Sequence, residues 1–260
     1  SYKPVSHQGA VVARVDFRRV GSPRVRVLGP KDFGGPGMIQ PVAFDYATKK
    51  LFIPVSDRKR FRLVVADCAR GVFAVERVVT LPGEPGDVAV DSRRGRVYMA
   101  MKPARVQVFR IGDMKKIADE NTPVRGGIDF IAPDEARGGL YVTTVGFHVA
   151  RVPFGSGRPA RRFMLTSFGV APAGAPENPL LFVASPGLDM LYALDPLTLA
   201  KRGRLRITGG IRSVCAAPDG GRVFAAAYAS GLLSVVDARA LPLRRIASVR
   251  LGKLLRRVSA

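Results

Sequence analysis

Short segments in which apolar and polar residues alternate follow one another along the whole chain. Clear examples are residues 106–109 and 233–236, which are rich in Val, Leu and aromatic residues. Alternation over a few residues, with β-branched and aromatic side chains at the apolar positions, predicts half-buried β-strands. Turns rich in Gly, Asp and Arg separate the segments, as at residues 219–221. The pattern therefore predicts an all-β fold.

The segments recur with a long period. An aromatic residue follows the same kind of turn at Phe52, Tyr98, Tyr141, Phe182 and Phe224, with spacings of 46, 43, 41 and 42 residues. A period of this length made of short strands is typical of β-propellers, whose blades bury their faces against neighbouring blades. Each copy predicts four strands, so we expect four-stranded antiparallel blades.

The two ends of the chain predict the number of blades. Residues 2–6, 12–16 and 24–29 resemble the second, third and fourth strands of a blade, and residues 255–260 resemble a first strand. We therefore expect a single six-bladed β-propeller domain over residues 1–260, closed by pairing of the C-terminal strand with the N-terminal strands. The alternative is a fragment of a seven-bladed propeller. The blades are expected at approximately 38–84, 85–127, 128–169, 170–210, 211–252, and 253–260 together with 1–37.

Two segments resemble known propeller repeats. Residues 85–109, with Gly95 and Tyr98 after the turn, resemble an NHL repeat, and residues 218–237 resemble a YVTN-type repeat. The resemblance implies a propeller that is commonly six-bladed. These families include RNA-binding modules, protein-interaction scaffolds and lactonase or lyase enzymes, so the fold does not choose the function.

The protein is strongly basic. It has 42 Lys and Arg against 20 Asp and Glu, a net charge of +22, and its last 60 residues hold 13 basic and two acidic residues. This balance favours anionic partners, either an acidic protein surface or nucleic acid. No apolar run is long enough to predict a membrane-spanning helix. The compartment and the oligomeric state are left open, and both cytoplasmic and extracytoplasmic locations fit.

Ligands of propellers usually bind at the mouth of the axial channel, where the first strand of each blade begins. The repeat alignment places five ligand-binding candidates there: Gln40, Asp87, Asp129, Arg212 and Arg256. A rim that is acidic on two blades and basic on two others is suited to orient a dipolar ligand or a peptide end. The alternative is that these charges pair with one another or are simply solvated.

A second set of candidates is basic. Arg58, Lys59, Arg60, Lys102 and Arg105 are expected on the loops between second and third strands, the face that NHL-type RNA binders use. The opposite face gathers more basic residues, and aromatic side chains for stacking bases are few, which argues against carrying RNA binding over directly. Arginines of the fourth strands also protect exposed sheet edges against pairing with other edges.

Catalytic chemistry has few candidates. The two histidines, His7 and His148, are expected too far apart to share a metal, and no serine nucleophile motif or phosphate-binding loop occurs. We predict no metal ligand, catalytic residue or cofactor, and a non-enzymatic binding scaffold for protein or other anionic partners. One alternative is a lactonase- or lyase-like enzyme, with Asp87 and Asp129 as acid, base or metal ligands and Arg212 and Arg256 as anion holders. A second alternative is an RNA-binding NHL-like module.

Overall fold

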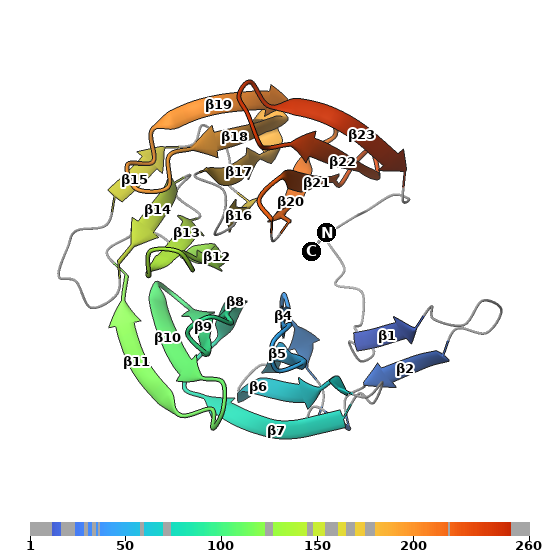
Figure 1. Ribbon diagram of the computed structural model, residues 1–260. Coiled ribbons are helices and arrows are strands. Elements are labelled where there is room, and N and C mark those ends of the chain that lie inside the picture. The colour runs from blue at the N-terminus through green and yellow to red at the C-terminus, as the bar shows by residue number, and fades with distance from the viewer. Residues whose placement is uncertain are drawn as a thin grey trace, which may run out of the picture. The chain divides into compact units, whose positions relative to one another are not determined.

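The computed structural model describes residues 12–16, 24–28, 31–32, 35, 37–57, 60–69, 74–122, 127–144, 148–153, 161–164, 170–174, 180–217 and 219–250. These residues form β-strands, turns and one three-residue 3₁₀ helix, η2 (Pro186–Leu188). The strands pair antiparallel in several sheets, which confirms the all-β prediction (Figure 1). In the part of the chain that the structure describes, no helix is long and apolar enough to span a membrane.

Among the described residues, five sheets have four or five strands each, and one has two. The two-stranded sheet pairs β1 (Val12–Asp16) with β2 (Arg24–Leu28). In the larger sheets the strands lie side by side in chain order, except that β3 and β4 both pair with β5. The strands of these sheets are β3 (Met38–Ile39), β4 (Ala43–Asp45), β5 (Lys50–Asp57), β6 (Arg60–Asp67) and β7 (Ala74–Leu81); β8 (Pro85–Asp91), β9 (Arg96–Met101), β10 (Arg105–Arg110) and β11 (Lys116–Asn121); β12 (Ile128–Pro133), β13 (Leu140–Thr144), β14 (His148–Val152) and β15 (Arg161–Met164); β16 (Val170–Gly174), β17 (Leu181–Ser185), β18 (Met190–Leu194) and β19 (Lys201–Arg206); and β20 (Ile211–Ala216), β21 (Arg222–Ala227), β22 (Leu232–Asp237) and β23 (Arg244–Arg250).

Strands β1 and β2 lie where the sequence predicts the third and fourth strands of a composite blade. Residues 1–11 and 251–260, which are predicted to complete that blade, lie outside the described residues. The number of blades and the closure of the propeller therefore stay predictions.

The chain separates into two compact units. The first comprises residues 1–102 and 108–117, and the second comprises residues 103–107 and 118–260, so β10 and β11 contribute residues to both. Within the first unit, β4 and β5 contact β8, and Phe52 and Leu63 share a hydrophobic core with Val88 and Met99.

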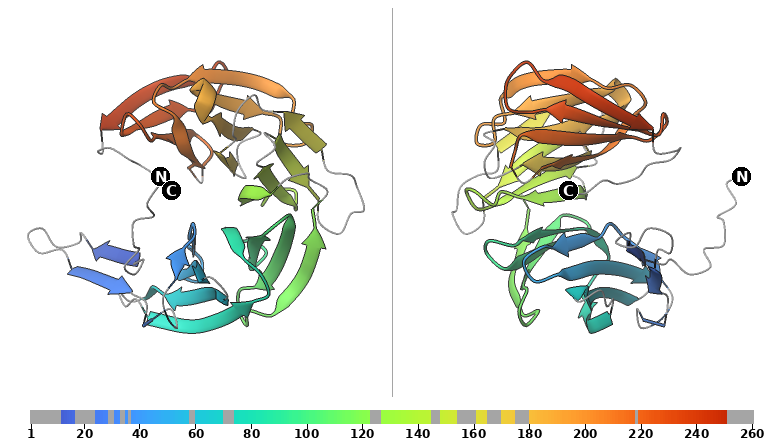
Figure 2. Two further views of the ribbon diagram at one scale, coloured as in Figure 1. Left: turned by 180° about the vertical axis from the view of Figure 1, so that it is seen from behind. Right: turned by 45° about the vertical axis from the view of Figure 1, so that its right-hand side comes forward.

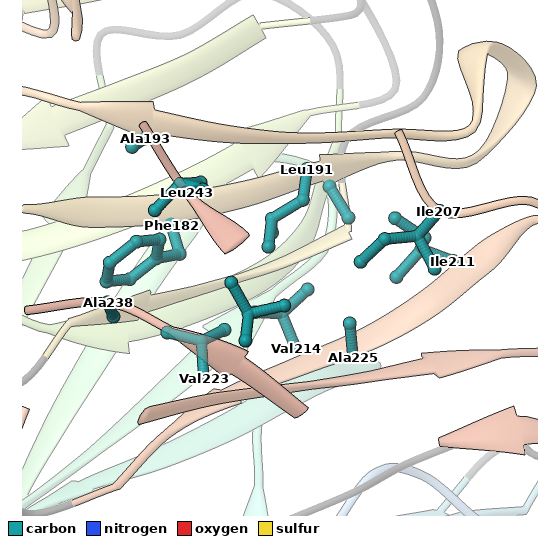
Figure 3. Close-up of a cluster of buried hydrophobic side chains, with 12 residues drawn as sticks. Phe182, Leu191, Ala193, Ile207, Ile211, Val214, Val223, Ala225, Ala238 and Leu243 are labelled. Carbon is teal, nitrogen blue, oxygen red and sulfur yellow. The ribbon is translucent and has the colours of Figure 1, made fainter. Parts of the chain in front are cut away.

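The second unit shows how one sheet covers the next. Every residue of β17 is buried, and successive side chains of a strand point to opposite faces. Phe182 packs with Val214 of the following sheet (Figure 3), whereas Leu181 packs with Tyr141 of the preceding sheet. The first strands β12, β16 and β20 are neighbours in the same way (Figure 2). The middle sheet is thus covered on both faces.

The aromatic residues that mark the repeat belong to the second strands. Four of them have exposed fractions between 0% and 2%: Phe52, Tyr98, Tyr141 and Phe182. Phe224 is half-buried and so departs from this pattern. Burial raises the pKa of Tyr141, whose hydroxyl donates a hydrogen bond to the carbonyl of Pro196 (3.2 Å) in the turn between β18 and β19.

Buried aspartates close the turn between the first and second strands in three sheets. Asp45, Asp91 and Asp134 are 1%, 1% and 3% exposed, and each accepts a backbone N–H from the residue three positions later. A buried carboxylate is tolerated only where hydrogen bonds or a cation satisfy it. Ser92 also donates a hydrogen bond to Asp45, which ties the turns of two successive sheets together.

Other aspartates close the turns that lead into fourth strands. The hydrogen bond from Arg202 (2.8 Å) lowers the pKa of Asp195, which also accepts the backbone N–H groups of Leu197 and Thr198. The hydrogen bond from Arg239 likewise lowers the pKa of Asp237 to about 2. These carboxylates are therefore ionised at neutral pH and already hold an arginine or a turn.

Replacing the Asp134 carboxylate tests this role. Asp134 accepts a hydrogen bond from Arg151 Nε at 2.9 Å, and the two side chains are only 3% and 14% exposed. Asp134→Ala leaves the buried Arg151 without its carboxylate and with only the carbonyl of Gly138 as an acceptor, so we expect the free energy of unfolding to fall by about 3 kcal/mol in urea titrations followed by circular dichroism. The control is Glu84→Ala, which breaks the exposed pair with Lys102 (2.7 Å) and should cost less than about 1 kcal/mol. Equal losses in the two variants would contradict the assignment.

Candidate functional site

Near its beginning, the first strand of each larger sheet contains a β-bulge, in which it has one residue more than the paired part of the second strand. In β8 the register passes from Pro85 opposite Met101 to Val88 opposite Met99, so two residues of β8 face one residue of β9. Residues 40–42 form the corresponding interruption between β3 and β4. Bulges of this kind bend the strand and redirect side chains, often beside functional sites. The other bulges lie between Ile128 and Phe130, between Val170 and Ala173, and between Ile211 and Ser213.

Four of the five channel-mouth candidates lie at these irregular positions. Asp87, Asp129 and Arg212 are bulge residues, and Gln40 lies in the interruption between β3 and β4. Arg256 lies outside the described residues. The repeat alignment therefore identified equivalent places in the fold, although it did not predict that they are bulges.

The two channel-mouth candidates of the first unit, Gln40 and Asp87, are buried to different degrees. Gln40 is half-buried, and its backbone N–H donates a hydrogen bond to the carbonyl of Pro54 (3.0 Å). Asp87 is 0% exposed and makes its interactions within the protein. A ligand in solvent cannot reach the Asp87 carboxylate without a rearrangement of β8.

Asp129, in the second unit, has a different environment. It is half-buried, and burial raises the pKa of its carboxyl group above the usual value of 3.8. No hydrogen bond or ion pair joins it to another side chain in the described ranges. A carboxyl group with a raised pKa and no partner is a recurrent feature of binding and catalytic sites.

Hydroxyl groups at the ends of the second strands were missed by the sequence analysis. Thr143 and Thr144, which pair with the residues flanking the Asp129 bulge, are 0% exposed, as is Ser185 at the end of β17. Their hydroxyl oxygens have no hydrogen-bond partner among the described residues. The sequence could have indicated these hydroxyl groups, because β13 and β17 are apolar strands that end in polar residues. At the equivalent end of β9 the residues are Ala100 and Met101.

Arg212 is exposed and held in place by an aromatic ring. Its guanidinium lies 5.7 Å from the centre of the Tyr228 ring, a distance at which a cation is attracted to the ring face. The backbone N–H of Tyr228 donates to the carbonyl of Gly210 (2.9 Å), and Asp189 accepts the N–H groups of Gly209 and Gly210 (3.1 and 2.8 Å). The loop before β20 is therefore fixed, and Arg212 presents its charge from a defined position.

The described members of the second candidate set are already paired with carboxylates. Arg60 lies 3.3 Å from Asp57, and the other two pairs are Lys102 with Glu84 at 2.7 Å and Arg105 with Asp119 at 2.6 Å. Arg58 and Lys59 lie outside the described residues. The charge of these loops is thus partly neutralised within the protein.

Unneutralised positive charge is found instead on the fourth strands of the second unit. Arg204 and Arg206 of β19 and the three arginines of β23 are all exposed. Among the side chains that the structure describes, none forms an ion pair with these five arginines, whereas Arg202 is held by Asp195. The β23 arginines are Arg244, Arg245 and Arg250.

Metal and thiol chemistry find little support in the described ranges. No group of three or more His, Cys, Asp or Glu side chains there is arranged to hold a metal ion. Cys68 and Cys215 are half-buried and form no disulfide within the described residues. His148 is half-buried in β14, and His7 lies outside the described residues.

Comparison with known proteins identifies the fold and nothing narrower. No family model and no curated protein sequence matches the chain. Among solved structures, 1593 chains match it. One belongs to the crystal structure of a nidogen–laminin complex; it is 13% identical, covers 95% of this chain and 93% of that chain, and has a TM-score of 0.71. The class is therefore a β-propeller-like, all-β protein. The resemblance to NHL and YVTN repeats stays a prediction.

Stability measurements can test the environment of Asp129. Its pKa is raised in the folded state, so between pH 3.8 and that raised value the folded protein holds a proton that the unfolded chain releases. Stability therefore falls as pH rises through this window, and the loss persists at neutral pH. We expect Asp129→Asn to raise the free energy of unfolding at pH 7, with a gain that disappears below pH 3.8. A variant that is less stable than the original protein at pH 7 would show that Asp129 has a stabilising partner.

Proposed function

We propose that the protein is a non-enzymatic binding scaffold whose partner is an acidic protein. The observation that supports the proposal is that three aspartates of the second unit are engaged within the protein, whereas several of its exposed arginines are not. Asp134, Asp195 and Asp237 close turns or hold arginines, while Arg204 and Arg206 of β19 and the three arginines of β23 remain exposed and form no ion pair within the described residues. Exposed unpaired cations on rigid strands attract an acidic surface with little loss of side-chain and backbone freedom.

The scaffold that we propose is a six-bladed propeller closed by pairing of residues 253–260 with strands from residues 1–37, with NHL- or YVTN-like blades. Repeated sheets that cover one another give a framework whose loops and edge strands can change without loss of the core. The similar chain in the nidogen–laminin complex comes from an assembly of two proteins, which supports a protein partner for this fold.

A synthetic acidic polymer tests the proposal. Polyglutamate of about 50 residues should bind with an affinity that falls as salt is added, because the contacts are ionic. Removing the charges of Arg244, Arg245 and Arg250 together by substitution with Gln should weaken binding about tenfold, since three exposed ionic contacts are worth roughly 0.5 kcal/mol each. Isothermal titration calorimetry at two salt concentrations measures both effects.

The matched control removes three other exposed cations that form no ion pair with a described residue. Substituting Lys49, Arg93 and Lys115 with Gln lowers the net charge by the same amount at turns of the first unit. Equal weakening by both triple variants would mean that polyglutamate senses only the net charge, and the proposal would fail. Tighter binding of single-stranded RNA of equal charge, lost in the same variant, would favour the RNA-binding alternative.

A lactonase- or lyase-like activity is a second candidate, favoured by one observation. The half-buried Asp129 carboxyl has a raised pKa and no partner in the described ranges, which suits a general acid. If this activity exists, Asp129→Asn should lower kcat for hydrolysis of a simple lactone at least about a hundredfold. The candidate is withdrawn if the substitution lowers kcat less than about tenfold or if the unmodified protein hydrolyses no lactone.

A further inference from the structure

Strand β23 is the last strand of its sheet. It pairs with β22 and has no other neighbour among the described strands. Every second backbone N–H and C=O group of such an edge strand points away from the sheet and can pair with another chain. Bound partners of other proteins use edges of this kind by adding an extended segment as a further strand.

The exposure of β23 separates it from β7, β11 and β19, which are the fourth strands of three other sheets. All seven of its residues are exposed, whereas β7, β11 and β19 each include partly or fully buried residues. Its two large apolar residues, Ile246 and Val249, are 44% and 49% exposed. Apolar side chains that remain this exposed on an edge strand gain from being covered by a partner.

The register of β23 limits the occupant. Ile246 is an extra residue between Arg245 and Ala247, so the regular edge runs over residues 247–250. A bulge and arginines on an edge disfavour pairing with an edge of like charge, including a second copy of this strand. Asp237 lies opposite Arg244, but Arg239 already holds its carboxylate at 3.0 Å. The arginines of β23 would instead attract a strand with acidic side chains.

We infer that the outer edge of β23 binds an extended acidic segment of a partner protein by strand addition. The segment pairs its backbone with residues 247–250, places acidic side chains beside Arg245 and Arg250, and covers Val249 with an apolar side chain. The inference rests on the proposed function and adds the mode of binding and the chemistry of the bound segment: alternating acidic and apolar residues in an extended conformation.

N-methylated peptides separate strand addition from a purely ionic contact. The probe is a capped peptide of eight alternating Glu and Val residues, together with two derivatives that carry N-methyl groups on alternate amides in opposite phases. All three peptides have the same charge. If the peptide adds to β23, one phase of methylation weakens binding about tenfold or more and the other phase changes it less than about twofold, because only alternate N–H groups face the strand.

The protein side of the experiment locates the contact. Arg245→Glu with Arg250→Glu should weaken binding of the parent peptide more than about tenfold, since both ionic contacts become repulsive. The matched control reverses two exposed charges of the first unit, Lys49→Glu with Arg93→Glu, and should change binding less than about threefold. Circular dichroism spectra of both double variants should match that of the original protein.

The outcomes are separable from those of the proposed function. Strand addition is overturned if both methylated peptides bind as well as the parent peptide, even where the Arg245 and Arg250 reversals weaken all three, and acidic-partner binding then stands. It is also overturned if the parent peptide does not bind while polyglutamate does. If neither the peptide nor polyglutamate binds, the proposed function falls together with this inference.

Discussion

Burial of the second strands on both faces is the constraint on which the rest of the structure depends. A strand such as β17, buried at every residue, is stable only where sheets on both sides remove its alternating side chains from water. Phe182 and Leu181 meet this need in opposite directions, toward two different hydrophobic clusters. The same need explains why the sequence repeats: each blade has to match the face of the one before it.

Polar chemistry is consequently found mainly at the ends and edges of the sheets, apart from buried residues such as Gln107 and Ser234. At one end, buried aspartates such as Asp45 and Asp134 stabilise the tight turns, and their carboxylates are no longer available to neutralise other cations. At the other end, bulges interrupt the first strands and carry Asp129 and Arg212. The exposed fourth strands keep the surplus arginines. Where unpaired positive charge lies on the surface thus depends on which cations the carboxylates already hold. The net charge alone does not predict this distribution.

Local patterns predicted most of the fold. Alternation and the turn residues located the strands, and the spacing of Phe52, Tyr98, Tyr141 and Phe182 identified the buried second strands, because both signals depend on nearby residues. The half-buried state of Phe224 was not predicted, since burial depends on which side chains the neighbouring strands supply.

The candidate site was predicted less well. The alignment treated Asp87 and Asp129 as equivalent, yet one is completely buried and the other is half-buried, because two residues occupy the bulge in β8 and one residue occupies the bulge in β12. Ion pairs such as that of Arg105 with Asp119 join different strands, so the charges of neighbouring residues in the sequence did not predict them. The stacking of Arg212 on Tyr228 depends on the loop between β19 and β20, whose geometry Asp189 sets.

The central claim is that the exposed fourth strands of the second unit bind an acidic protein. Hydrogen–deuterium exchange of the protein with and without polyglutamate tests this claim most directly. Amide exchange reports, segment by segment, where a bound partner covers or pairs with the backbone. The account predicts slower exchange on binding in residues 244–250, with a smaller effect in residues 201–206, and no change in the turns at residues 46–49 and 92–95. Protection confined to residues 127–130 and 209–213, or no protection anywhere, would contradict it.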